Sequence, residues 1–117
     1  MPQLIAAPTR IPVPGGKVID EYVGRVTSGT TAVSVAHMRA PAGWAEPAQT
    51  PEFDEVTLVL AGTVLVAHDG GELAVHAGQA VCTRAGERVR YRAGAEGAEY
   101  VAVCLPAFAP DLAHREG

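Results

Sequence analysis

The stretch TVLVAHDGGELAVH, residues 63–76, indicates the class of fold. Its two halves are rich in strand-forming and apolar residues, and between them stands Asp69-Gly70-Gly71. Glycine supplies the positive φ angles that tight hairpin turns need. The stretch therefore predicts a β-hairpin with strands Thr63–His68 and Glu72–His76.

Further segments of strand type recur on both sides of this hairpin, and Gly and Pro residues separate them. The other predicted strands are Lys17–Tyr22, Gly24–Thr27, Thr31–Arg39, Phe53–Leu60, Ala80–Thr83, Arg88–Arg92 and Tyr100–Leu105. Turns are predicted at Ala61-Gly62, His76-Ala77-Gly78 and Ala85-Gly86. No helix is predicted. Many short strands at this spacing predict an all-β sandwich or barrel, with a small jelly roll as the natural candidate.

The chain length predicts one domain over residues 1–117, because 117 residues with 48% hydrophobic content suit a single core. Residues 1–16 are rich in proline, which removes donors from a strand ladder, so we expect an N-terminal arm that wraps the outside. Residues 106–117 are expected to form an irregular C-terminal tail.

Composition argues against several classes of partner. The formal net charge is −4 and aromatic residues make up 5%, so we expect no nucleic-acid partner. No apolar run is long enough to span a membrane, and no signal peptide is evident, so a soluble cytoplasmic protein is predicted. Cys82 and Cys104 lie in apolar alternating segments without a metal-binding spacing and are expected to be buried thiols.

Two stretches of the chain resemble the two motifs of the cupin superfamily. In the first motif, Gly43, Glu55 and Gly62 stand at the spacing of the family's conserved positions, with Gln49-Thr50-Pro51 in place of His-x-His. In the second, the glycines Gly78 and Gly86 match, whereas Val89 stands where the family has histidine. The resemblance covers residues 31–105 and implies a cupin-type jelly-roll β-barrel. Within the superfamily, the chain is similar to small single-domain members of the ethanolamine-utilisation type, whose metal positions are often altered.

The resemblance also implies where a metal would bind, and this chain departs from that pattern. Metal cupins use histidine side chains and one glutamate, a ligand set suited to Fe, Mn, Ni or Zn. Gln49, Pro51 and Val89 replace the histidines, so Glu55 remains as the strong ligand. We therefore expect no metal cofactor. The alternative is a weak divalent-metal site made by His37, Gln49 and Glu55, against which His37 is an ordinary hydrogen-bonded strand residue.

Without a metal, Glu55 becomes the candidate catalytic group. Strand alternation places Phe53, Glu55 and Thr57 on one face, which the resemblance implies is the barrel interior. Apolar neighbours such as Phe53 and Val89 would desolvate the carboxyl, raise its pKa and suit it to proton transfer. The same alternation aligns Tyr91 with Val89, so Tyr91 is predicted to assist as donor or acid. Alternatively, Glu55 is a structural carboxylate held by the backbone and Tyr91.

Other residues are candidates for substrate binding. Gln49 would orient a carbonyl group, and Arg39 would hold a carboxylate unless it forms a surface ion pair. Trp44 would be either a lid over the ligand or a packing plug. His37 shares a face with Arg39 and would face the same cavity, while Phe53 and Val89 would supply apolar walls.

These residues lead to a prediction of function with alternatives. The first is a small-molecule enzyme that uses acid–base chemistry in the barrel for isomerisation, cyclisation, dehydration or decarboxylation. The alternatives are a noncatalytic protein that binds a small ligand, and a metal-dependent dioxygenase or lyase with an incomplete ligand set. Val56, Leu58 and Leu60 are all apolar on the other face of their strand, so a homodimer is also predicted.

Overall fold

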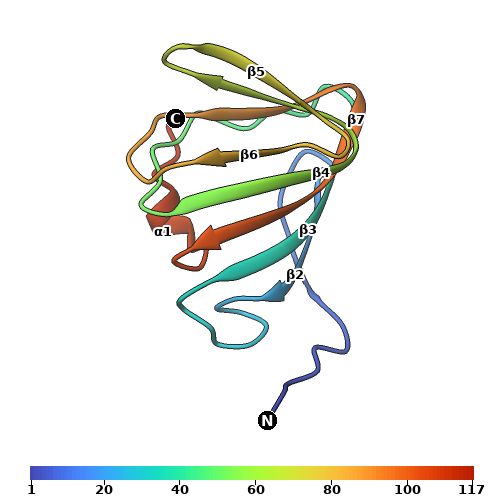
Figure 1. The fold of residues 1–117 in the computed structure, drawn as a ribbon, viewed down its shortest axis with the longest axis vertical. Coiled ribbons are helices and arrows are strands. Elements are labelled where there is room, and N and C mark those ends of the chain that lie inside the picture. Colours follow the sequence, from blue (N-terminus) through green and yellow to red (C-terminus); the bar gives the residue numbers. More distant parts are fainter.

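Seven strands and one short helix make up the fold in the computed structural model, which describes residues 1–117 (Figure 1). The elements are β1 (Thr9–Ile11), β2 (Val18–Val23), β3 (Ser34–Ala40), β4 (Asp54–His68), β5 (Gly71–His76), β6 (Ala80–Thr83), β7 (Arg90–Leu105) and α1 (Pro110–Ala113). All strand pairs are antiparallel, in the order β1-β2-β3-β7-β4-β5, and β6 pairs with β4. The sheet curls around a central space, which confirms the predicted all-β jelly-roll barrel.

The hairpin predicted from residues 63–76 is present, with Thr63 opposite His76 and His68 opposite Gly71. One predicted turn is wrong: Ala61-Gly62 does not end a strand, and β4 continues through it. Gly62 has a φ of +72°, and the ladder to β7 shifts register on both sides of it. A Cβ atom there would overlap the carbonyl oxygen of Gly97. Glycine therefore permits a bulge that bends one long strand.

The second long strand, β7, joins two segments that were predicted separately. Its interior side chains are Tyr91 and Ala93 before the corner at Gly94–Gly97, and Tyr100, Ala102 and Cys104 after it. The inward positions change from odd to even numbers because the corner inserts residues that do not pair. The strand thus lines two parts of the same barrel.

Strand alternation separates an inner from an outer face on β4. Thr57 and Val59 are almost fully buried, at 1% and 0% exposure, whereas Leu58 and Leu60 are 42% and 47% exposed. The N-terminal arm does not cover these leucines, so this apolar face stays exposed within one chain. The predicted homodimer stays a prediction.

The terminal segments differ in part from expectation. Residues Thr9–Ile11 of the arm form an edge strand against β2, and the first residues extend away from the barrel (Figure 1). The tail contains the short helix α1, whereas the sequence predicted no helix. None of the helices in the structure has the length and apolar character of a membrane span. Gly24–Thr27 is a turn rather than a strand, because the Glu21 carboxylate accepts hydrogen bonds from the backbone of Val26 and Thr27.

Candidate functional site

A cavity of about 200 Å³ lies inside the curled sheet. Strands β2, β3, β4 and β7 form its wall, and the arm and the tail add further residues. Its polar and charged lining consists of Lys17, Glu21, Ser34, Glu46, Gln49, Glu55, Tyr91, Tyr100 and Arg115. Ten of the nineteen lining residues are hydrophobic, so the charged groups share a mostly apolar enclosure.

Glu55 is the central ionisable group of this cavity. It is half-buried by surface area because its side chain opens onto the cavity, yet the surrounding protein shields it from bulk water. This burial, together with the negative charge of Glu46, raises the pKa of Glu55 to about 7, against the opposing positive charges of Lys17 and Arg115. A carboxyl with that pKa exchanges protons readily near neutral pH.

Three further charged side chains accompany Glu55. Arg115, from the C-terminal tail, places its guanidinium 3.4 Å from the Glu46 carboxylate. Burial raises the pKa of Glu46, while Lys17 and Arg115 lower it. Lys17 stands just before β2, with its ammonium group 4.0 Å from the centre of the Trp44 ring. The cavity therefore holds two cations beside the carboxyl groups of Glu46 and Glu55, while its third carboxylate, Glu21, accepts hydrogen bonds from the turn after β2.

Tyr91 and Gln49, both predicted site residues, also line the cavity. The Tyr91 hydroxyl lies 2.9 Å from the hydroxyl of Thr83 and forms no hydrogen bond with Glu55. The alternative in which Tyr91 holds Glu55 as a structural pair therefore has no support in the geometry. The Gln49 backbone pairs with Val89, and its side-chain oxygen accepts a hydrogen bond from Arg115 at 3.3 Å. Its amide N–H groups have no protein acceptor.

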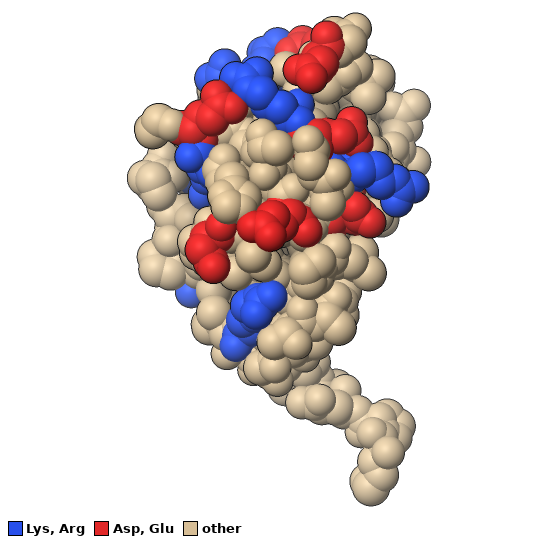
Figure 2. Space-filling view, turned by 90° about the vertical axis from the view of Figure 1, so that its left-hand side faces the viewer, with Lys and Arg blue, Asp and Glu red and all other residues tan.

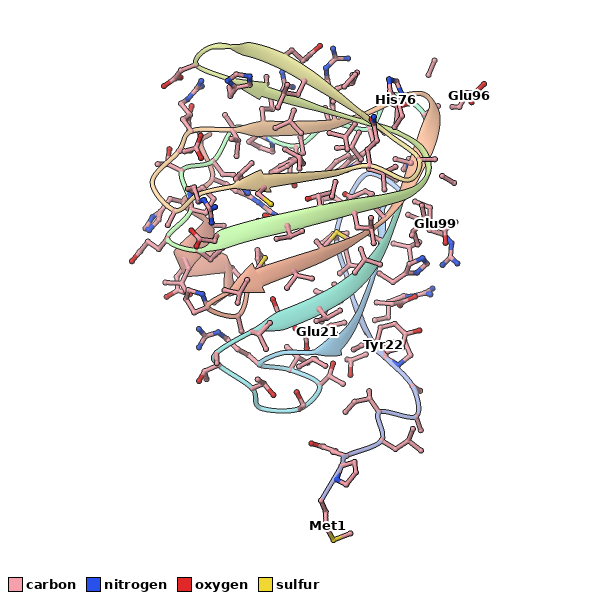
Figure 3. The ribbon with its side chains drawn as sticks, in the orientation of Figure 1. Met1, Glu21, Tyr22, His76, Glu96 and Glu99 are labelled. Carbon is pink, nitrogen blue, oxygen red and sulfur yellow. The ribbon has the colours of Figure 1, made fainter.

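The prediction that His37 and Arg39 bind substrate in the cavity is wrong, because both residues lie outside it. Alternation on β3 turns Ser34 and Ala36 inward and therefore turns His37 and Arg39 to the outer face. The His37 ring binds Glu99 at 2.6 Å, and Arg39 lies 3.6 Å from the same carboxylate. Figure 3 shows Glu99 at the outer side of the sheet. His37 is therefore the hydrogen-bonded strand residue, and Arg39 belongs to the surface ion pair, that the sequence analysis gave as alternatives.

The three remaining candidates surround the cavity without lining it. Phe53 and Val89 are 1% and 2% exposed and belong to the packed core, where Phe53 meets Phe108 edge to face. Trp44 borders a neighbouring hollow, and one of its faces contacts Lys17. Cys104 is buried as predicted, whereas Cys82 is exposed because it lies on the outer side of β6.

The residues at the family's metal positions do not fit a metal ion. Pro51 and Val89 have no donor atom in their side chains, and His37 lies on the opposite side of the sheet from Glu55. No group of three or more His, Cys, Asp or Glu side chains is placed to hold a metal. The weak site considered from His37, Gln49 and Glu55 therefore does not form.

Sequence reasoning missed Lys17, Glu46, Tyr100 and Arg115. Lys17 carried one signal, since it is the only lysine in the chain. Arg115 carried none, because its position in the cavity depends on how the tail folds back across the barrel.

The comparisons place this fold among known proteins. No family model matches the chain. Solved structures with the same fold include oxalate decarboxylase from Bacillus subtilis, with a TM-score of 0.76 and 18% identity over 95% of this chain and 30% of that one. A putative ethanolamine utilization protein from Salmonella typhimurium has a TM-score of 0.62 and 18% identity over 79% and 71% of the two chains. Pac13, a nucleoside dehydratase from Streptomyces, has a TM-score of 0.77 and 13% identity over 99% and 90%. The chain thus has a cupin-like fold.

A curated relative bears on function. "Endoribonuclease YbeY" from Myxococcus xanthus is 49% identical over 107 residues, which are 91% of this chain and 36% of the relative. The chain therefore spans about a third of that protein's length.

This relative overturns the predicted function, because its name is that of an enzyme acting on RNA. The expected small-molecule enzyme and small-molecule ligand, and the expected absence of a nucleic-acid partner, are corrected accordingly. The net charge on which that expectation depended does not describe the cavity, because Lys17 and Arg115 lie in its lining although the chain is negative.

Proposed function

We propose that this chain cleaves RNA by metal-independent acid–base chemistry in its barrel cavity. The observation that carries the proposal is the 49% identity to a protein named an endoribonuclease, over nearly the whole of this chain. The charged cavity is the feature of the fold that supplies suitable chemistry.

RNA contains its own nucleophile, the ribose 2′-hydroxyl, and a base that removes its proton starts cleavage of the adjacent phosphodiester. Glu55 suits this role because its pKa of about 7 leaves it ionised in a large fraction of molecules at neutral pH. Its carboxylate opens into the cavity beside the hydroxyl of Thr57 and forms no hydrogen bond with Tyr91, so a substrate hydroxyl can reach it from the cavity side. Tyr91 remains a proposed assisting donor from the same wall.

The phosphate gains negative charge as the reaction proceeds, and the two cations of the cavity would stabilise it. Arg115 offers a planar guanidinium that suits phosphate oxygens, although it also contacts Glu46. Lys17 adds an ammonium group in the same enclosure. A charge held in a site with little water acts more strongly than one at the surface.

The size and surface of the molecule indicate how RNA would bind. A cavity of about 200 Å³ suits the sugar and phosphate of a single strand, where the reacting atoms lie, and not a duplex. Acidic and basic side chains are interspersed on the face shown in Figure 2, and Arg88 and Arg92 are paired with Glu116 and Glu72. Contacts along the RNA backbone would therefore be few, and binding would depend weakly on salt.

A second candidate function follows from the length of the relative. Since the chain spans 36% of that protein, it corresponds to one segment of it. In this alternative, the segment holds an RNA nucleotide in the cavity while another part of a longer protein cuts the strand. The cavity residues would then bind RNA without cleaving it.

Three finer expectations accompany this proposal. We infer that the chain is a small cupin whose metal positions have changed, as in the ethanolamine-utilisation type. Residues 1–117 would act as one domain, and its location would be cytoplasmic. The residue changes at Pro51 and Val89 support the first of these.

Cleavage of a labelled single-stranded RNA by the purified chain, in the presence of EDTA, tests the proposal. We expect products with a 2′,3′-cyclic phosphate, detected by mass spectrometry, and no cleavage of DNA of the same sequence, which lacks the nucleophile. Glu55→Gln should abolish cleavage, whereas the exposed Glu96→Gln, prepared identically, should keep it. RNA binding without cleavage would support the second candidate, and the absence of both would refute both.

A further inference from the structure

The only lysine of the chain, Lys17, lies at the boundary between the cavity and the neighbouring hollow beside Trp44, and it lines both. It stands at the end of the N-terminal arm, immediately before β2. Its ammonium group lies 4.0 Å from the centre of the Trp44 ring and 5.5 Å from that of Tyr100. These ring faces favour the cation without accepting ordinary hydrogen bonds from it.

Lys17 differs from Arg115, the other cation of the cavity, in having no ion-pair partner. Arg115 has the Glu46 carboxylate within 4 Å, and six of the chain's arginines form such ion pairs. Lys17 has no carboxylate within that distance and no hydrogen-bond acceptor, although Glu46 and Glu55 influence it through space. Its N–H groups are therefore available to a ligand in the cavity.

The strand register sets Lys17 and Glu55 toward opposite ends of the cavity. Glu55 pairs with Cys104, which pairs with Ser34 at the start of β3. Tyr100 and Met38 form another pair, four residues further along β7 and β3 from the pair of Cys104 and Ser34. Lys17 lies beyond this second pair, next to Val18 at the start of β2. A phosphodiester bound between Lys17 and Glu55 would have the ammonium group on one side and the carboxylate on the other.

We propose that Lys17 is the general acid of RNA cleavage, which protonates the leaving oxygen while Glu55 acts as the base. The inference rests on the proposed function. A bond forms between the ribose 2′-oxygen and phosphorus, and the bond from phosphorus to the 5′-oxygen breaks. Glu55 takes the proton of the 2′-hydroxyl, and the ammonium group gives one to the 5′-oxygen. The products are a 2′,3′-cyclic phosphate and a 5′-hydroxyl, and both side chains then exchange protons with water.

Electrostatics supports this assignment of roles. Burial lowers the pKa of Lys17 from its ordinary value, and the two glutamates limit the effect. A lysine with a lowered pKa gives up its proton more readily than an exposed one. Arginine holds its proton too firmly for this task, so Arg115 is suited to binding charge instead.

The leaving group of the substrate provides the sharpest test. Lys17→Arg keeps a positive charge but is a far weaker acid, and Lys17→Gln removes both properties. We compare ordinary RNA with uridine 3′-(4-nitrophenyl phosphate), whose nitrophenolate leaves without a proton. Both variants should cleave RNA roughly 100-fold more slowly than the wild type, in line with the usual contribution of general acid catalysis. For the nitrophenyl ester, Lys17→Arg should stay close to the wild type, and Glu55→Gln should lose activity.

The other outcomes identify which inference fails. If Lys17→Arg loses activity equally on both substrates, or keeps full activity on both, Lys17 is not the general acid, while the proposed function stands. If the wild type cleaves neither substrate, the proposed function fails and the role of Lys17 fails with it. The pH profile gives a second readout: the decrease in rate at high pH should disappear in Lys17→Gln. Thermal melting of each variant confirms that it is folded.

Discussion

Replacement of Glu55 by glutamine should stabilise the protein at alkaline pH and leave its stability nearly unchanged at acidic pH. The folded protein raises the pKa of Glu55 from 4.5 to about 7. Between these values the folded chain keeps a proton that the unfolded chain releases. The free energy of unfolding of the wild type therefore falls as pH rises from about 4.5 to about 7 and is constant above that range. Glutamine does not titrate and avoids this loss.

The size of the effect follows from the two pKa values. Each pH unit of difference corresponds to about 1.4 kcal/mol, so ionised Glu55 costs on the order of 3 kcal/mol. For a domain of this size, 1 kcal/mol moves the melting temperature by roughly 4 °C. At pH 8 the Glu55→Gln variant should therefore melt on the order of 10 °C above the wild type, and at pH 4.5 the two should nearly coincide.

Melting curves followed by circular dichroism from pH 4.5 to pH 8.5 provide the assay. Glu96→Gln is the matched control, since Glu96 is exposed and forms no ion pair. Its curve should follow that of the wild type at every pH. A Glu55→Gln variant that melts below the wild type at pH 8 would refute the reasoning, because Glu55 would then be a stabilising structural carboxylate.

Three further predictions concern the cavity and the fold. Arg115→Leu removes a charge that lowers the pKa of Glu55, so half-maximal RNA cleavage should move to higher pH; an unchanged pH profile, like that expected of the exposed Arg84→Leu, would contradict this. Gly62→Ala should lower the free energy of unfolding by about 3 kcal/mol or more in urea, because its Cβ meets the Gly97 carbonyl, whereas Gly78→Ala, with open space around it, should lose only about 1 kcal/mol. EDTA should leave RNA cleavage intact, since the residues present do not fit a metal; a loss that a divalent cation restores would show a site that we have missed.

The sequence alone determined the local elements and the position of Glu55. Turn residues with positive φ angles predicted the hairpin at residues 63–76, and two-residue alternation grouped Phe53, Glu55 and Thr57 on one face. Both signals act over a few neighbouring residues, so they can be read without knowing the rest of the fold. The prediction of a turn at Gly62 is wrong because a positive φ at glycine permits a bulge within a strand as well as a turn between strands.

Tertiary structure alone decided which groups share the cavity with Glu55. Alternation placed His37 and Arg39 on one face of β3, but only the curvature of the sheet made that face the outer one. Lys17 and Arg115 come from segments at opposite ends of the chain, and they line one cavity because the arm and the tail fold across the same barrel. A repeating local pattern contains no information on such distant contacts, which depend on the closure of the sheet and on the packing of the terminal segments.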